Sequence, residues 1–326
     1  MVRPHLVLPI LAGALTVLPG GTGVAQTRAP AAALEPIALH AGFLRTSFSG
    51  VNESDAQAAF RVFATRMGEI RGYAISAHVH VFEGTAPLAE YLAEDSLDLL
   101  VIDSWDYLTM EPIPNLPVAF AAVEQGEVED EFLVLVAERS PMSGVSDLAG
   151  KHVIVLQSSN ASTIRHWFRT EILALGQGEP ERVLGRLELK DGLSQTVLPV
   201  FFGKADACVV DRRGFEIMVE MNPQVGRALR VLARSDPYVD TVLSVRMRGW
   251  EREGQRQDLL DAIQDLPNDP AGRQIMTLFK FDGVVPFEPH YLDSMRSLRR
   301  RYESLVSARG GGEGFQPASG QGGSRP

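Results

Sequence analysis

The chain has 326 residues, of which 45% are hydrophobic and 22% charged, and its formal net charge at pH 7 is −10. This length allows one large domain or two of medium size. The acidic balance argues against a nucleic-acid-binding protein, which would present a basic face, but not against a small anionic ligand, because a local pocket can oppose the overall charge.

The N-terminus has the features of an export signal. Residues 1–25 combine a positive charge at Arg3, a short apolar stretch and small residues before Gln26. This pattern predicts a secretory signal peptide with cleavage after Ala25, and therefore an exported, periplasmic protein. An uncleaved anchor is the alternative, although the apolar stretch is short for a bilayer span. Residues 26–34 are predicted to be a linker.

Strand and helix patterns alternate from residue 37 onward. Residues 37–43, 73–82 and 97–103 are predicted strands, and helices are predicted between them. The first helix shows a capping-box pattern at Ser54 and Gln57, and Phe60, Phe63, Met67 and Ile70 mark one of its faces. The second is expected to be capped by Thr85. This βαβαβ order favours a parallel sheet with right-handed crossovers.

The same alternation recurs in the second half. Strands are predicted over 130–138, 152–156, 185–189, 206–211, 229–233 and 241–247, with helices between most of them. The chain is then expected to finish with helices, one of them capped by Asp269 with Pro270 in its first turn. Residues 309–326, rich in Gly, Ser and Pro, are predicted to be disordered.

One junction is crowded with hydroxyl and amide side chains: Ser158, Ser159, Asn160, Ser162 and Thr163 lie where a strand gives way to a helix. A serine nucleophile is disfavoured because no glycine elbow surrounds these serines, and the sequon at Asn160 is interpreted as chance. Unpaired backbone N–H groups at such a junction favour an oxyanion. A helix cap alone is an equally good explanation, and the sequence leaves both open.

A second candidate region follows the strand that ends at Asp103. Asp103, Ser104 and Trp105 lie at the carboxyl end of that strand, where open α/β sheets bind ligands. The aromatic side chains either close over a ligand or pack on the following helix. His78 and His80 share one face of a strand, but no third ligand is near in sequence, so no metal and no cofactor are predicted.

Several motifs together resemble the periplasmic solute-binding proteins of phosphate/phosphonate-type ABC transporters. These are IALHAGF, VIDSWDYL, VSDLAGKHVIVLQSSNAST, PVFFGKADACVVD and NDPAGRQIMTLFKFDGVVPF, within a span of about Ile37 to Leu298. The resemblance implies a two-lobed α/β fold of type II, each lobe a mixed, mostly parallel sheet flanked by helices. Lobe 1 is expected to comprise residues 35–132 and 240–308, and lobe 2 residues 133–239.

The resemblance also implies a ligand site in a cleft between the lobes. Its predicted contacts are Arg45, Thr46, Thr85, Asp103, Ser104, Trp105, Ser159, Asn160, Ser162, Thr163, Ser194 and Asp211. The family's Ser-Thr-Ser-Gly turn, which grips phosphonate oxygens, matches residues 160–163, where Ala161 removes a hydroxyl and Thr163 replaces the glycine. Arg45 suits an anionic group and Asp103 and Asp211 suit an amine, so a zwitterion would satisfy all three. A cap of the following helix is the alternative role for Asp211.

The resemblance predicts a non-enzymatic, monomeric binding protein. It would capture a small anionic or zwitterionic solute by hinge closure and deliver it to an ABC transporter permease in the inner membrane. Two alternatives remain open at this point. One is a ligand-sensing protein that docks on a membrane signalling receptor, and a more distant one is a secreted serine hydrolase.

Overall fold

The computed structural model describes residues 34–48, 51–94, 96–157 and 161–308. The predicted signal peptide, nearly all of the predicted linker and the predicted disordered tail lie outside these residues, as do Ser158, Ser159 and Asn160. Within the described ranges, no helix combines the length and the hydropathy that a bilayer span requires.

The strands form two mixed sheets. The six-stranded sheet has the order β11-β4-β10-β3-β1-β2, and the five-stranded sheet has the order β7-β6-β8-β5-β9. The strands of the first are β1 (Glu35–Leu44), β2 (Tyr73–Phe82), β3 (Leu99–Asp103), β4 (Val118–Val123), β10 (Thr241–Val245) and β11 (Gly283–Pro286). Those of the second are β5 (Phe132–Ala137), β6 (His152–Leu156), β7 (Arg186–Lys190), β8 (Ala207–Asp211) and β9 (Leu229–Arg234).

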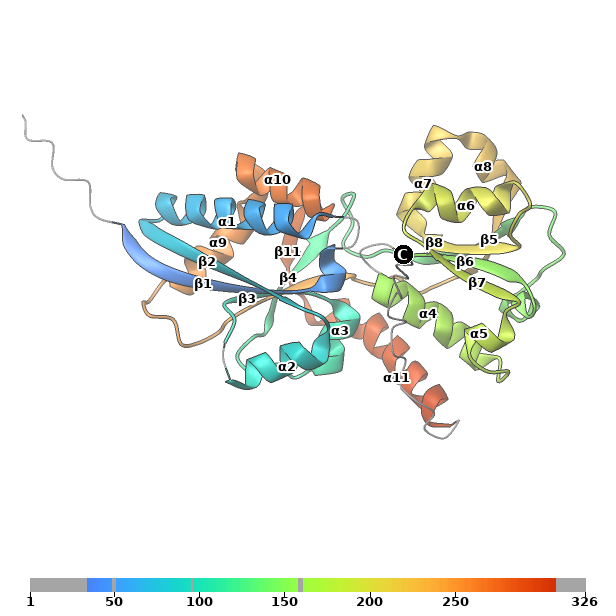
Figure 1. Ribbon diagram of the computed structural model, residues 1–326, viewed down its shortest axis with the longest axis horizontal. Coiled ribbons are helices and arrows are strands. Elements are labelled where there is room, and N and C mark those ends of the chain that lie inside the picture. Colours follow the sequence, from blue (N-terminus) through green and yellow to red (C-terminus); the bar gives the residue numbers. More distant parts are fainter. Residues whose placement is uncertain (1–33, 49–50, 95, 158–160, 309–326) are drawn as a thin grey trace, which may run out of the picture. The chain divides into compact units, whose positions relative to one another are not determined.

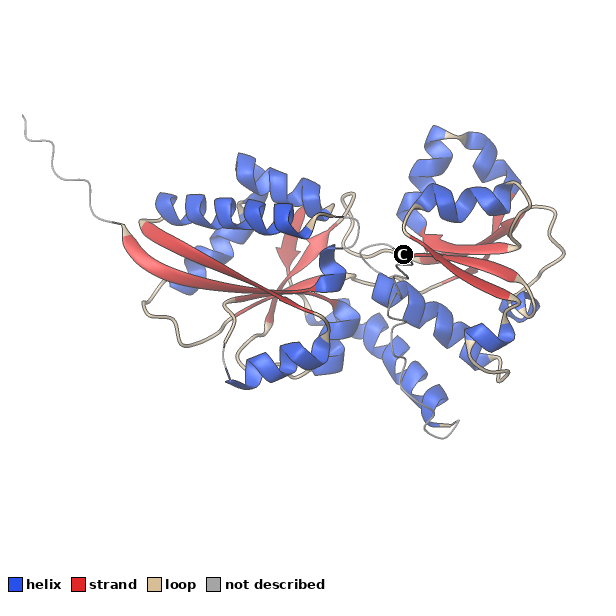
Figure 2. Ribbon diagram, viewed as in Figure 1, coloured by secondary structure: helices blue, strands red, loops and turns tan. Residues whose placement is uncertain are grey.

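Helices cover both faces of each sheet (Figures 1 and 2). One face of the six-stranded sheet carries α1, α9 and α10, and the other carries α2 and α3. The five-stranded sheet has α6, α7 and α8 on one side and α4 and α5 on the other. The bounds are α1 (Glu53–Ile70), α2 (Thr85–Glu94), α3 (Ser104–Met110), α4 (Ala161–Ala174), α5 (Pro180–Val183), α6 (Leu193–Phe201), α7 (Arg212–Met221), α8 (Pro223–Ala228), α9 (Gln255–Gln264), α10 (Pro270–Phe279) and α11 (Asp293–Ser307).

The parallel strands carry the site-bearing loops. β1 pairs in parallel with β2 and β3, and β6 pairs in parallel with β7 and β8. The added strands β4, β5, β9, β10 and β11 pair antiparallel. Because parallel strands end at the same edge of a sheet, the carboxyl ends of β1 and β3 lie close together, and so do those of β6 and β8. The predicted βαβαβ unit is confirmed.

Helix α1 shows how the apolar pattern builds the core. Phe60, Phe63 and Met67 are buried, and they pack with Phe43 and other side chains on one face of β1. Ile70, predicted on the same helical face, is instead exposed at the helix end. Apolar periodicity thus identified the buried face correctly, except in the last turn.

The chain passes twice between the sheets. Strands β1–β4 and β10–β11 belong to the six-stranded sheet, whereas β5–β9 belong to the five-stranded sheet. The connecting segments are therefore 124–131 and 235–240, and an antiparallel bridge between Asp130 and Tyr238 joins them. The assignment of lobes at 132/133 and 239/240 follows this division closely and stays a prediction.

Two details differ from the sequence-based expectations, and a third agrees with them. Strands β4 and β11 were not predicted, since β11 is only four residues long and follows α10 in a region expected to be helical. Helix α1 is capped by Asn52, whose side chain accepts a hydrogen bond from the Asp55 N–H at 3.1 Å, rather than by Ser54. The predicted cap at Asp269, followed by Pro270, is confirmed.

Helix α10 approaches the turn before it closely enough to require glycine. A Cβ added at Gly272 would lie 2.2 Å from the carbonyl oxygen of Leu266, a backbone atom that cannot move aside alone. We expect Gly272→Ala to lower the free energy of unfolding by about 1–3 kcal/mol through this overpacking. Urea titration measures the change. Gly84→Ala, where an added Cβ meets open space, is the matched control, and equal stability of both variants would contradict the prediction.

Candidate functional site

Asp103 occupies the end of β3 and the start of α3. Its carboxylate accepts the Trp105 N–H at 2.8 Å and so caps α3. It also accepts the Thr163 hydroxyl, at 3.1 and 3.3 Å from its two oxygens. Thr163 lies in the first turn of α4, so this contact joins the six-stranded sheet to a helix of the five-stranded sheet. Two residues predicted from separate motifs therefore meet directly.

Burial changes the charge of this carboxyl group. Desolvation, with a smaller effect of the nearby Asp106 carboxylate, raises the pKa of Asp103 to about 8, although its hydrogen bonds oppose the shift. Burial likewise raises the pKa of Asp106 to about 6, against the attraction of Arg165. Burial therefore favours the neutral form of Asp103, in which the carboxyl group carries a proton that it can donate.

The ring of Trp105 packs against other aromatic side chains. It stacks on His166 with centroids 3.9 Å apart, and Tyr302 of α11 meets both rings edge-on. Burial lowers the pKa of His166 to about 4, so the ring is neutral, and its Nδ1–H donates to the Ser162 carbonyl oxygen at 2.7 Å. Of the two roles that the sequence allowed for Trp105, this geometry favours packing.

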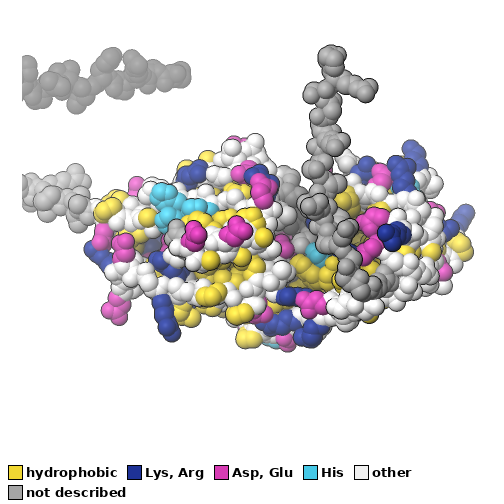
Figure 3. Space-filling view, turned by 60° about the horizontal axis from the view of Figure 1, so that its bottom comes forward, with side chains coloured by type: hydrophobic (Ala, Val, Ile, Leu, Met, Phe, Trp, Pro, Cys, Tyr) yellow, Lys and Arg dark blue, Asp and Glu magenta, His cyan; other side chains and the backbone are white. Residues whose placement is uncertain are grey.

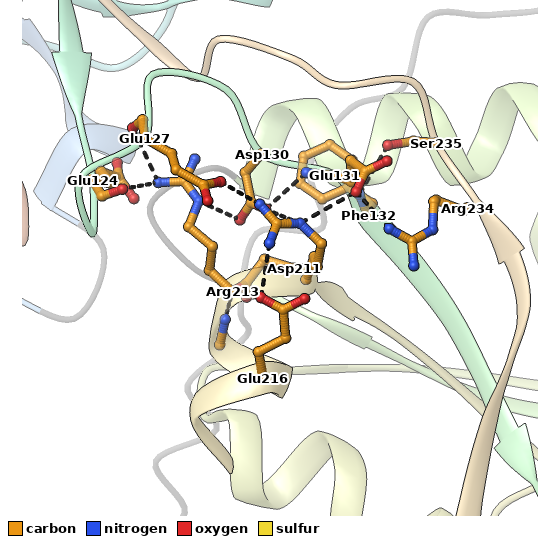
Figure 4. A network of polar contacts seen from close by, with 12 residues as sticks. Glu124, Glu127, Asp130, Glu131, Phe132, Asp211, Arg213, Glu216, Arg234 and Ser235 are labelled. Carbon is orange, nitrogen blue, oxygen red and sulfur yellow. Dashed lines mark hydrogen bonds and ion pairs between the residues drawn. The ribbon is translucent and has the colours of Figure 1, made fainter. Parts of the chain in front are cut away.

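A network of ion pairs surrounds the first connecting segment (Figure 4). Arg213, buried at the start of α7, pairs with Asp130 at 3.2 Å and donates to the Glu124 carbonyl oxygen. Its neighbour Arg212 pairs with Glu131 at 3.2 Å and also with Glu127. Burial raises the pKa of Glu124 to about 7 and that of Asp130 to about 6, and in both cases Arg213 opposes the shift.

The other residues predicted to bind the ligand make contacts of several kinds. Asp211 caps α7 by accepting the Gly214 N–H at 2.6 Å, as the alternative reading expected. Ser104 donates to the Val239 carbonyl oxygen at 2.5 Å. Arg45 is half-exposed and pairs with Glu53 and Glu83 at 2.6 and 2.8 Å. Thr85 begins α2, and Ser194 is exposed in the first turn of α6.

Thr46 and Asp103 both line the polar end of a cavity. This cavity lies between the six-stranded sheet and the helices α1 and α10 that cover one of its faces. The cavity has a volume of about 100 Å³ and is lined mainly by apolar side chains. Glu124 and Thr241 also line this end. The structure thus brings together Thr46, Asp103 and Thr163. The sequence missed Glu124 and Arg213, and only the arginine pair directly after Asp211 hinted at their role.

Neither a metal site nor a serine triad is formed by the described residues. His40 of β1 joins His78 and His80 in a group of stacked rings, and Figure 3 shows histidines gathered on the surface. Within the described ranges, however, no three His, Cys, Asp or Glu side chains are placed to hold a metal ion. The contact that His166 makes with Ser162 is to its carbonyl oxygen and not to its hydroxyl, so it does not activate that serine.

One family model matches most of the chain. Residues 48–292 match the model of the family described as ABC transporter, phosphonate, periplasmic substrate-binding protein. No curated protein sequence matches. The structure is similar to XAC2383 from Xanthomonas citri bound to chloride ion, with a TM-score of 0.60 and 15% identity over 83% of this chain and 99% of that one.

Two further solved structures are similar. A binding protein component of an ABC phosphonate transporter from Pseudomonas aeruginosa has a TM-score of 0.55 and 14% identity, over 86% of this chain and 91% of that one. PhnD1 from Prochlorococcus marinus in complex with methylphosphonate has a TM-score of 0.54 and 14% identity, over 82% and 98%.

Proposed function

Since the chain belongs to the family of periplasmic substrate-binding proteins of phosphonate ABC transporters, we propose that its ligand binds where Thr46 and Asp103 meet Thr163 and Asp211. The family resemblance and the type II fold predicted from the sequence are confirmed. The chain is thus a periplasmic solute-binding component of an ABC transporter. The identity of its ligand and the residues that bind it are the subject of the proposal.

The contact between Asp103 and Thr163 carries the proposal. It joins a strand end of one sheet to a helix start of the other, and a cleft that closes by hinge motion would meet its ligand there. Buried carboxylates would ordinarily repel an oxyanion. Because burial raises the pKa of Asp103, the neutral form of its carboxyl group is favoured, and this form can donate a hydrogen bond to an oxyanion.

The ligand class that suits this site is a small phosphonate-like anion or zwitterion. The hydroxyls of Thr46, Ser162 and Thr163 suit the oxyanion, and Asp211 suits an amine. Arg45 would have to leave Glu53 and Glu83 to reach an anion. We retain Thr85, Ser104, Trp105, Ser159, Asn160 and Ser194 as further candidate contacts. The proposed protein is a monomer and performs no chemistry on its ligand.

Ligand binding and its dependence on Thr163 test the proposal. Methylphosphonate and 2-aminoethylphosphonate are expected to raise the melting temperature of the mature chain, whereas glucose is not. Thr163→Val, which removes the hydroxyl and keeps the shape, should weaken phosphonate affinity about tenfold by calorimetry.

Thr170→Val is the matched control. Thr170 is also buried in α4, but its hydroxyl donates to the carbonyl oxygen of His166 in its own helix, at 2.6 Å. This variant should bind phosphonates as the parent does. Absence of phosphonate binding by the parent chain, or equal affinities of the parent and Thr163→Val, would overturn the proposal.

A further inference from the structure

We infer that the ligand carries a compact apolar group, and that this group is held in the cavity whose polar end includes Thr46 and Asp103. The inference rests on the proposed function and adds a substrate class to it. We call this space the aromatic cavity, because Phe43, Phe60, Phe63 and Phe279 form much of its wall. It lies between β1, β3 and β10 on one side and α1 and α10 on the other.

The packing around the aromatic cavity is incomplete. Protein interiors are normally close-packed and contain few voids larger than a water molecule, yet this one has a volume of about 100 Å³. Val101 lines it and is only half-buried, although β3 lies inside the sheet. A second cavity of about 70 Å³ shares four wall residues with it, which are Phe60, Phe63, Leu99 and Ile263.

The polar groups of the aromatic cavity gather at the strand edge. Thr46 and Ser47 follow β1, Asp103 ends β3, Glu124 follows β4 and Thr241 begins the antiparallel β10. The same Asp103 accepts the hydroxyl of Thr163 in α4. A ligand whose polar head occupies the proposed site would therefore have its substituent directed into an apolar space.

The size and lining of the aromatic cavity define the substituent. An apolar cavity of roughly 150 Å³ can take up benzene, so a volume of about 100 Å³ suits a smaller group, such as a branched alkyl group of about four carbons. A charged or strongly polar substituent would lose its hydration among the phenylalanines without a partner. The inferred ligand is therefore an alkyl-substituted phosphonate or aminophosphonate.

Pairs of ligands with identical heads test the inference. Isobutylphosphonate is compared with methylphosphonate, and 1-amino-3-methylbutylphosphonate with 1-aminoethylphosphonate, by calorimetry on the mature chain. We expect the branched member of each pair to bind about tenfold or more tightly, because its alkyl group leaves water. If the small ligands bind and the branched ligands bind no better, the aromatic cavity is not a subsite, while the proposed function stands. If none binds, both fail.

Filling the aromatic cavity should abolish the difference between the two members of a pair. Val101→Phe and, independently, Ala122→Leu place side-chain volume inside it, and each is expected to remove the advantage of the branched ligands while the small ligands still bind. A misfolded variant would bind neither member, so loss of folding is distinguishable. Ala64→Val, which faces only the neighbouring 70 Å³ cavity, is the control and should keep the advantage. Persistence of the advantage in both filled variants would overturn the inference.

Discussion

At pH 8 the Asp103→Asn variant is expected to be more stable than the parent chain by on the order of 3 kcal/mol, whereas at pH 5 the two should differ much less. Asparagine caps a helix as well as aspartate does, so its amide oxygen can still accept the Trp105 N–H, and its amide NH2 group can donate to the Thr163 hydroxyl oxygen. The substitution therefore removes the ionisation of Asp103 with little other change.

The sign of this stability difference follows from the raised pKa of Asp103. Burial, with a smaller effect of Asp106, raises the pKa of Asp103 to about 8 in the folded chain, whereas an unfolded aspartate has a pKa of roughly 3.9. The folded state therefore keeps a proton that the unfolded state releases, and stability is lost as the pH rises from about 4 to about 8. Each unit of difference corresponds to about 1.4 kcal/mol, and coupling to Asp106 reduces the total.

Asp269 provides a matched control, because its pKa is shifted in the opposite direction to that of Asp103. It also caps a helix, by accepting the Ala271 N–H at 2.8 Å, and burial acts to raise its pKa. The hydrogen bond from Arg66 at 2.6 Å, the positive charge of Arg66 and the backbone N–H groups of Ala271 and Gly272 together outweigh burial and lower that pKa below its usual value. Its stabilising effect is present above the unfolded pKa and is lost as the pH falls through the folded pKa.

Asp269→Asn should therefore be destabilising at pH 8. Guanidinium titrations of both variants and the parent at pH 5 and pH 8 measure these differences. A destabilised Asp103→Asn at pH 8 would contradict the assignment of a neutral Asp103. It would also remove the reason for admitting an oxyanion beside this carboxyl group.

Arg213→Leu is expected to lower the free energy of unfolding by about 3–5 kcal/mol at pH 8. The Arg213 side chain is 7% exposed and is paired with Asp130, itself 6% exposed. Its removal leaves Asp130 and Glu124 buried without this cation. Because Arg213 opposes the rise in the pKa of both acids, their pKa values should increase further in the variant. The destabilisation should then grow as the pH rises, since the unfolded chain releases the protons that these acids retain.

Arg234→Leu is the control for Arg213→Leu. Arg234 pairs with Glu131 at 2.6 Å, but its side chain is 48% exposed. An exposed ion pair contributes about 0–1 kcal/mol. Urea titrations of both variants should therefore give clearly different midpoints, and similar midpoints would show that the buried network around the first connecting segment is not important for stability. Loss of Arg213 should also change hinge closure, because this network links α7 to the segment between the two sheets.

The sequence by itself determined the fold class and most of the elements. Short apolar runs between helical segments predicted the parallel strands, because a strand buried on both faces is apolar along its length. The caps at Asp211 and Asp269 follow from local backbone N–H groups, which adjacent side chains can satisfy. The sequence missed β4 and β11, since their formation depends on antiparallel partners far along the chain, such as the pairing of Gly283 with Val123.

The tertiary structure decided which of the candidate residues meet and which carry charge. Thr163 and Asp103 lie 60 residues apart, and neither motif indicated that they are in contact. The pKa of Asp103 depends on its desolvation, a property of the assembled fold. Likewise, only the packing of α1 and α10 on the sheet leaves a cavity beside Thr46. Local patterns fix where a chain turns and caps, whereas burial and long-range contact arise only when separate elements pack together.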